Sequence, residues 1–461
     1  MSAMASAGFA APVMRSRPVR LHWQTLVEVA VCVVPGMALV ALHRPQLAAR
    51  SVPATLFCFL VFHAVQQDRY RFFSVALGAM PVLGFLRGLF FYHSVTVFLT
   101  MGIGLWAGLC LKELAFVWKD LAWRWLVGLC IVFWWASVLY TGDYFSNSRY
   151  LDFALAITAM YLLAKQRGYL ATALAGVALS ATALAMGLLP VAGDRLGLAQ
   201  IDGMEIGNPI QMGVPTALIV LMCFADNGRW LLLEDKPWWR VVVCSISGMW
   251  LLLSGSRGSW IVTILGFLLI MIFSKQDRKP IFAALGVMCL AAILLLATDK
   301  GSGVINQYDR SVDSDRSLKS RTSGRSVQWE VLPSIFAESP VWGWGPGSGR
   351  DVDWIFTQRH LEWHALYIQI IAETGLLGFL PLMTLLGVFL VRSISHLRRY
   401  GEIAPLICVV TFMVLGLSVT AVDALGGIIL GIGFVTMRNT PRYVIRQHFA
   451  TVESDEMVIQ L

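Results

Sequence analysis

The sequence predicts an all-α, polytopic membrane protein, and three observations point to this class. Of the 461 residues, 57% are hydrophobic and only 14% are charged, whereas soluble domains are about 45–50% apolar and roughly 25% charged. The hydrophobic residues fall in long runs, and a helix needs about 20 apolar residues to cross the hydrocarbon core. Small basic clusters separate the runs. This composition excludes a soluble enzyme and a disordered chain.

The apolar runs predict the individual spans. The first, from about Thr25 to Leu42, is longer than the roughly 7–15-residue core of a signal peptide, so we interpret it as an uncleaved span. Some later runs are short enough to be halves of one bent or re-entrant helix. We therefore expect an even number of crossings, about twelve to fourteen. The later runs lie at about 53–66, 72–86, 89–111, 122–141, 151–164, 169–189, 209–225, 238–254, 259–273, 280–297, 365–391, 404–419 and 423–437.

Basic residues predict the orientation, because short loops rich in Lys and Arg stay in the cytoplasm. Such clusters fall on alternate connections, so both termini are expected inside. The net charge of +8 is thus spread over small clusters rather than gathered on one face, which excludes a nucleic-acid-binding protein. The clusters are the N-terminus, Arg69/Arg71, Lys112/Lys119, Lys165/Arg167, Arg229/Lys236/Arg240, Lys275/Arg278/Lys279, Arg392/Arg398/Arg399 and Arg438/Arg442/Arg446.

The chain divides into three parts on this topology. Residues 1–297 and 364–461 hold the spans, and 298–363 form one long loop on the outer side, which also receives the connection at 190–208 and a tight turn at Ser254–Ser259. The loop starts with a Ser-rich stretch that we expect to be flexible. It continues with Trp329, Leu332, Ile335 and Phe336 at helical spacing. These predict an amphipathic helix on the outer membrane face.

The cysteines give no sign of a metal site or a disulfide framework. All eight lie inside or beside apolar runs, where cysteine behaves as a small hydrophobic residue. No spacing of Cys and His suits zinc. We expect no metal and no cofactor.

Three arginines on the predicted outer side are candidates for binding an anion. Arg257 lies between apolar helices in LLLSGSRGSWIV, where an unpaired charge costs about 2.5–3.5 kcal/mol. Its alternative is an interfacial arginine that snorkels to water. Arg325 opens the amphipathic segment with Trp329 one turn later, and a solvent-exposed arginine fits equally. Arg195 precedes the GNPIQMG turn, which predicts either a phosphate-binding helix N-terminus or an ordinary capped turn.

Two histidines end the long loop. His360 and His364 share a face if the next helix begins early enough. An imidazole, with an unperturbed pKa of about 6.5, exchanges a proton near neutrality. A metal pair, a structural histidine and a general base all remain open from spacing alone. Glu373 is about half a turn out of phase with His364, so it should not reach the same site along the helix. Asp423 begins the last span and could orient a histidine or arginine.

Four segments together carry a resemblance. HALYIQIIAETGLLG places His364 before Glu373, Gly375 and Gly378, with Ala365 where an Asn, Ser or Gln is usual. SGSRGSW contains Arg257. SGRSVQWEVLPSIFAESPVWGWGPGS contains Arg325, Trp329, Pro340, Gly343 and Gly345, and GNPIQMG completes the set. In order and spacing, these segments of about 190–390 resemble the O-antigen ligase family.

This resemblance implies a fold, a reaction and partners. The family implies a large bundle of the GT-C-like class and a metal-independent, inverting glycosyltransferase in the bacterial inner membrane, with its active site facing the periplasm. Its donor is a glycan on undecaprenyl diphosphate, and its acceptor is a sugar hydroxyl of the lipid A core in lipopolysaccharide biosynthesis. The expected partners are therefore these two lipids and the membrane itself.

The resemblance implies a role for each candidate residue, and the chemistry of these residue types suits those roles. Arg257, Arg325 and Arg195 are expected to bind the diphosphate, since guanidinium pairs with phosphate oxygens bidentately. His364 is expected to be the catalytic base, with His360, Asp423 and Trp329 in support. Related alternatives are an O-antigen polymerase and a protein O-oligosaccharyltransferase. A lipid flippase or transporter is the alternative of another class. No inverted hydropathy repeat supports it.

Overall fold

The computed structural model describes most of the chain. The described residues are 20–89, 148–164, 166–191, 199–201, 204–206, 209–274, 278–297, 305, 309, 325–345, 348–358, 365–418 and 425–437. The predicted span at 122–141 and, apart from Leu89, the one at 89–111 lie outside these residues.

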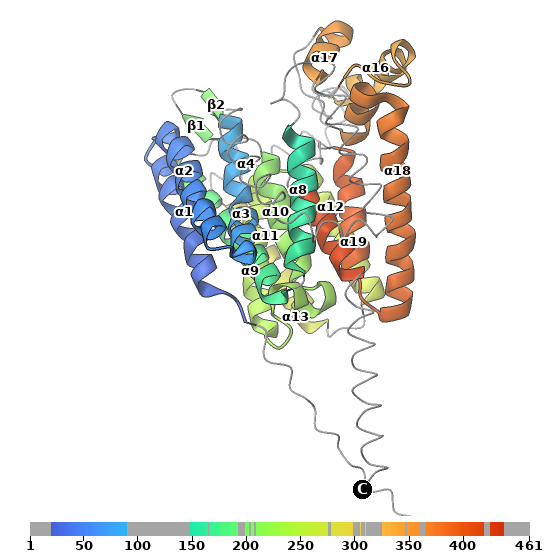
Figure 1. The fold of residues 1–461 in the computed structure, drawn as a ribbon. Helices are drawn as coiled ribbons and strands as arrows, with labels where there is room; N and C mark the ends of the chain where they lie inside the picture. The colour runs from blue at the N-terminus through green and yellow to red at the C-terminus, as the bar shows by residue number, and fades with distance from the viewer. Residues whose placement is uncertain are drawn as a thin grey trace, which may run out of the picture.

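The described residues are helical apart from one short hairpin. The long axes of the main helices run in roughly one direction and form a bundle (Figure 1). Their bounds lie close to the predicted runs, although α18 is much longer than expected. The bundle helices are α1 (Trp23–Ala41), α2 (Pro45–Val65), α3 (Arg69–Gly78), α4 (Met80–Leu89), α8 (Ser148–Leu163), α9 (Arg167–Leu188), α10 (Pro209–Met222), α11 (Pro237–Ser254), α12 (Arg257–Phe273), α13 (Lys279–Leu296), α18 (Leu366–Tyr400), α19 (Ala404–Gly416) and Leu425–Met437.

Four of the described helices, α1, α2, α9 and α18, are long and apolar enough to cross a membrane. The number is up to five if α10 and the 3₁₀ helix η1 (Ala225–Leu231), which meet at a bend of 113°, form one broken span. Four shorter apolar helices accompany them, α12, α13, α19 and Leu425–Met437. The protein is therefore a helical membrane protein with several crossings, and the figure of about twelve spans stays a prediction.

The outer faces of the bundle are apolar. On α12, Ile264 is 62% exposed and Ile272 is 67% exposed, and on α13, Ile293 is 65% exposed. A soluble protein rarely exposes such contiguous apolar surface, whereas a bundle in lipid requires it. Trp23 and Trp238, at the starts of α1 and α11, are 70% and 74% exposed. Tryptophan is enriched at membrane interfaces.

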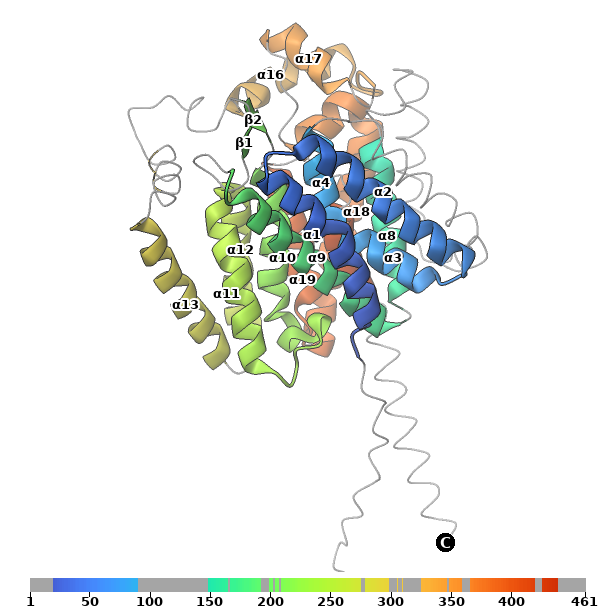
Figure 2. The same ribbon diagram turned by 90° about the vertical axis from the view of Figure 1, so that its left-hand side faces the viewer.

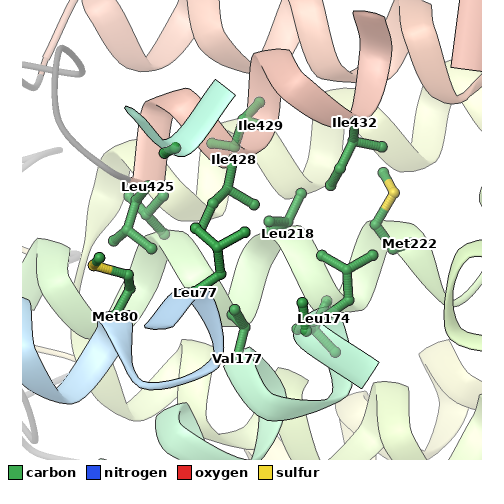
Figure 3. Packing of buried hydrophobic residues seen from close by; sticks show 14 of the residues in the cluster. Leu77, Met80, Leu174, Val177, Leu218, Met222, Leu425, Ile428, Ile429 and Ile432 are labelled. Atoms are coloured by element: carbon green, nitrogen blue, oxygen red, sulfur yellow. The ribbon is translucent and has the colours of Figure 1, made fainter. Parts of the chain in front are cut away.

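The core lies where α3, α4, α9, α10 and the helix Leu425–Met437 meet. Leu77, Leu174, Leu218 and Ile428 converge there from four of these helices (Figure 3). The backbones of α3 and α9 approach closely, because a Cβ on Gly176 would lie 2.9 Å from the Gly78 Cα. Ser180 donates to the Gly78 carbonyl oxygen at 2.6 Å. Small residues and a buried hydroxyl are typical of helix packing in membranes.

One end of the bundle carries an ionic network. The imidazole of His22 stacks on Tyr169, which brings the starts of α1 and α9 together. Arg167 pairs with Glu234, and Arg229 pairs with Glu402 at 2.6 Å. These basic residues belong to connections predicted to face the cytosol, so the structure gathers at one end several loops that the charge pattern assigned to one side.

The opposite end carries the remaining elements. These are the antiparallel hairpin of β1 (Ala199–Ile201) and β2 (Met204–Ile206) and two helices, α16 (Arg325–Glu338) and α17 (Gly349–Thr357). Figures 1 and 2 both show them above the bundle. The hairpin was not expected in the 190–208 connection, whereas a helix with Trp329, Leu332, Ile335 and Phe336 was. The predicted flexible stretch lies almost wholly outside the described residues.

Candidate functional site

The starts of three helices meet at the end of the bundle below α16 and α17. A Cβ on Gly213 in α10 would lie 2.6 Å from the Ser256 Cβ, next to the start of α12. A Cβ on Gly258 would lie 2.5 Å from the Ser418 Oγ, just after α19. Gly416 in turn packs against Leu366, the first residue of α18. We call the starts of α10, α12 and α18, with the end of α19, the site end.

A tight turn positions the start of α12, as predicted for Ser254–Ser259. The left-handed backbone of Gly255, with φ of 64°, ends α11. The Ser254 hydroxyl accepts from the Ser256 N–H at 3.2 Å. The indole of Trp260 donates to the Leu251 carbonyl oxygen at 2.9 Å, which ties α12 back to α11. This bonding holds the first turn of α12 in a defined place.

Arg257 is the first residue of α12 and is half-buried. The N-terminus of a helix has free N–H groups and a partial positive charge. The starts of α10 and α18 lie at the same end. The helix Leu425–Met437 runs antiparallel to α19, since its Gly433 packs on Pro405 near the start of α19, so its N-terminus faces this end as well. The Arg257 side chain and the N–H groups at the start of α12 attract an anion locally, whereas the ends of α11 and α19 nearby carry the opposite partial charge.

A small second core lies above the site end. Ile335 of α16 and Val352 of α17 pack against Ala365, Ile368 and Ala372. The indole of Trp344 donates to the Ile335 carbonyl oxygen at 3.3 Å. We call α16, α17 and the turn at residues 339–345 the cap. The cap therefore packs on the start of α18.

The turn at 339–345 meets α18 at a break in that helix. Gly375 has φ of 57° and ψ of −153°, which is not helical. Four backbone N–H groups bond across this break, from Trp344 to Ala372 O at 2.8 Å, from Gly345 to Glu373 O at 2.9 Å, from Leu376 to Pro340 O at 2.9 Å and from Leu377 to Val341 O at 3.2 Å. The carbonyl and N–H groups that the break frees are thus satisfied by the turn.

Both glycines at this contact are required by geometry. The φ of Gly375 is disfavoured for residues with a side chain, and a Cβ there would lie 2.5 Å from the Val341 carbonyl oxygen. Gly343 has φ of 68°, and its Cβ would lie 2.5 Å from the Thr374 nitrogen. The motif glycines at these two positions therefore join the cap to α18.

The structure places three of the seven predicted site residues. Arg257 lies at the site end. Arg325 is the first residue of α16, as expected, although its side chain is not described. Trp329 lies one turn later and is 42% exposed, so it is not part of the core beneath the cap. Arg195, His360, His364 and Asp423 lie outside the described residues. His364 directly precedes Ala365, which is fully buried under the cap.

The sequence analysis did not predict that two buried polar residues of α18, Gln369 and Glu373, pair with each other. Gln369 donates through Nε2 to the Glu373 carboxylate at 3.0 Å, and both side chains are at most 5% exposed. The Gln369 Oε1 atom is buried and has no hydrogen-bond partner among the described residues. The sequence signal that could have predicted this pair is a glutamine and a glutamate four residues apart in an apolar run, a spacing that places both on one helix face. Among the described residues, no group of three metal-binding side chains comes together.

The fold and the site end define a class of protein, a helical membrane protein with an arginine at the start of a helix, beneath a small cap. A family model described as O-antigen ligase matches residues 242–383, from α11 to the middle of α18. This match supports membership of the O-antigen ligase family and confirms the resemblance of the motifs. The match supports an enzyme of the ligase or polymerase type. No curated protein matches the chain.

Proposed function

We propose that the protein is an O-antigen ligase. It transfers a glycan from undecaprenyl diphosphate to a sugar hydroxyl of lipid A core, with inversion and without a metal, at the periplasmic face of the bacterial inner membrane. The observation that carries the proposal is that two helix starts both pack on the end of α19 at the site end. One start holds Arg257, and the other follows His364 in the chain.

Arg257 binds the donor diphosphate in this proposal. Its guanidinium offers parallel N–H donors to phosphate oxygens and stays protonated. The free N–H groups at the start of α12 add to the attraction. Arg325, at the start of α16 above, and Arg195, in the connection before β1, complete the cationic surroundings of the leaving diphosphate. Such fixed charges stabilise the negative charge that develops in the transition state.

His364 is the general base. It takes the proton of the acceptor hydroxyl as that oxygen attacks the anomeric carbon from the face opposite the diphosphate. The new carbon–oxygen bond forms while the bond to the diphosphate oxygen breaks, and undecaprenyl diphosphate leaves with the electron pair. His360 and Asp423 hold His364 or the arginines in place. Trp329, exposed on α16, contacts lipid or sugar at the membrane surface.

The test is a reaction with defined components. Purified protein is mixed with a lipid-linked glycan and lipid A core, with and without a chelator, and the products are identified by mass. We expect one glycan chain attached to the core, at the same rate with chelator. A lengthened lipid-linked glycan would instead identify a polymerase, and glycan on protein a protein O-oligosaccharyltransferase. Movement of the lipid across vesicles with no covalent product would favour a transporter.

A deletion strain discriminates independently. Loss of a ligase should leave core-only lipopolysaccharide while lipid-linked polymer accumulates. Loss of a polymerase should leave core that carries one repeat. The second pattern would overturn the ligase assignment.

A further inference from the structure

The break at Gly375 sends the first part of α18 in a different direction from the rest. At the far end of α18, His396 contacts Glu402 at 3.1 Å, just before α19. At its start, the Tyr367 hydroxyl donates to the Met413 carbonyl oxygen at 2.9 Å. At 1.5 Å per residue, a straight α18 would place residues 367 and 396 about 44 Å apart, whereas residues 402 and 413 are separated by only about 16 Å along the chain of α19. A straight helix cannot make both contacts.

The segment Leu366–Thr374 is therefore an arm that folds over towards the end of α19. We use this name for it below. Ile368 and Ala372 on the arm pack under the cap, and Leu366 and Tyr367 at its tip pack on α19. The arm is thus held at its base by the turn at 339–345 and at its tip by α19. Residue 364 lies two positions before the arm.

We propose that Gly343 and Gly375 are positioning residues that set the direction of the arm and so fix the chain that carries His364, the proposed base for the acceptor hydroxyl, two residues before the arm. The inference rests on the proposed function, because the two glycines act through His364. Their contact is made of backbone atoms at 2.5 Å from any added Cβ, so a side chain at either position must move the base of the arm.

A small change at the base has a large effect at the tip. The arm is about 13 Å long at 1.5 Å per residue, so a rotation of about 5° displaces its tip by roughly 1 Å. A misplacement of about 1 Å at reacting groups can cost on the order of 100-fold in rate. The base of the arm therefore controls catalysis without touching the substrates.

The experiment compares Gly375→Ala with Gly387→Ala in the same helix. A Cβ on Gly387 meets no atom of the described part of the chain within 4 Å, so this variant is the matched control. We expect Gly375→Ala to lower kcat about 100-fold while KM for the lipid-linked donor stays within about threefold, since Arg257 is undisturbed. The fall of kcat on the acidic side of the parent pH profile should flatten because the base no longer acts. Gly387→Ala should match the parent in every respect.

Two variants with smaller expected effects keep the proposal testable if Gly375→Ala does not fold. Gly343→Ala changes the other side of the same contact. Ser339→Ala removes the hydroxyl that donates to the Gly343 carbonyl oxygen at 2.6 Å and leaves both glycines in place. We expect kcat to fall in the order Ser339→Ala, Gly343→Ala, Gly375→Ala. A kcat within about threefold of the parent for both glycine variants would overturn the proposal, as would an equal loss of donor binding and kcat with an unchanged pH profile.

Cross-linking separates this proposal from the proposed function. A Cβ on Gly416 would lie 3.2 Å from the Leu366 Cδ2, so cysteines at 366 and 416 should be joined by a short bifunctional thiol reagent. Adding Gly375→Ala should lower that yield, and adding Gly387→Ala should not. If the parent transfers no glycan but the cross-linking yield falls only with Gly375→Ala, the proposed function is wrong and the positioning role of the glycines stands. If the parent transfers glycan but the cross-linking yields with Gly375→Ala and Gly387→Ala are equal, the positioning role is wrong and the proposed function stands.

Discussion

Gly258 packs directly against Ser418, so closely that a Cβ on Gly258 would come within 2.5 Å of the Ser418 hydroxyl oxygen. This contact joins the first turn of α12, which carries Arg257, to the end of α19. Because α19 also receives the tip of α18, the contact links the proposed diphosphate-binding arginine to the helix that follows the proposed base. The four predictions below test this arrangement.

Gly258→Ala should lower transfer modestly. The Ser418 hydroxyl must rotate away from the new methyl group and lose its 3.4 Å bond to the Leu415 carbonyl oxygen, at a cost of about 1 kcal/mol. We expect glycan transfer to fall several-fold, as measured by initial rates. Ser418→Gly in the same chain should restore the rate. Gly286→Ala, where a Cβ meets nothing within 4 Å, is the control, and an unrestored double variant would argue against a steric cause.

Arg257→Lys should weaken the donor site although the charge is kept. Lysine presents a point charge in place of the planar fork. We expect kcat/KM for the lipid-linked donor to fall at least about tenfold, which corresponds to 1.4 kcal/mol. Arg44→Lys, in the exposed turn between α1 and α2, is the matched control. Parent-level activity of Arg257→Lys would show that a point charge is sufficient.

His364→Ala should slow transfer and spare donor binding. Removal of a general base costs roughly 10²–10⁴-fold, so kcat should fall in this range while undecaprenyl diphosphate still protects the protein against heat. His43→Ala provides the comparison, because His43 is exposed in the turn between α1 and α2. If the His364→Ala enzyme kept the parent kcat, another group would have to be the base.

Ile335→Ala should loosen the cap. Ile335 is fully buried between α16 and the start of α18, and such a truncation costs about 2–5 kcal/mol. We expect faster hydrogen exchange across α16 and the arm, together with slower transfer, and no change in α1 or α2. Ile355→Ala removes a side chain that is 53% exposed on α17 and should leave exchange as it is. Equal exchange in both variants would contradict the packing of the cap on α18.

Much of the bundle was predictable from local sequence. Apolar runs are long because a span must cross about 30 Å of hydrocarbon, and they are helical because the backbone must satisfy its own hydrogen bonds in lipid. The run at 259–273 accordingly became α12 at Arg257–Phe273. The start of α16 at Arg325 and the turn before α12 were also predicted, since spacing and turn residues are local signals. The family assignment followed from motifs that the family model confirms.

The path of α18 was not predictable in this way. Its run of apolar residues around Gly375 reads as one continuous helix, and Glu373 was judged only by its helical phase relative to His364. The break depends on hydrogen bonds from residues 340–345, which lie some thirty positions earlier in the chain. Local helix propensity cannot predict a pairing between segments this far apart in the chain.

The sequence by itself determined that the chain is a helical membrane protein, where most of its apolar helices lie and which residue types are available for the chemistry. Only the tertiary structure decided that Gly213 meets Ser256, that Gly258 meets Ser418 and that the arm turns towards α19. The physical reason is that helix formation depends on neighbours within a few residues, whereas close backbone contacts depend on the complementary shapes of helices far apart in the chain.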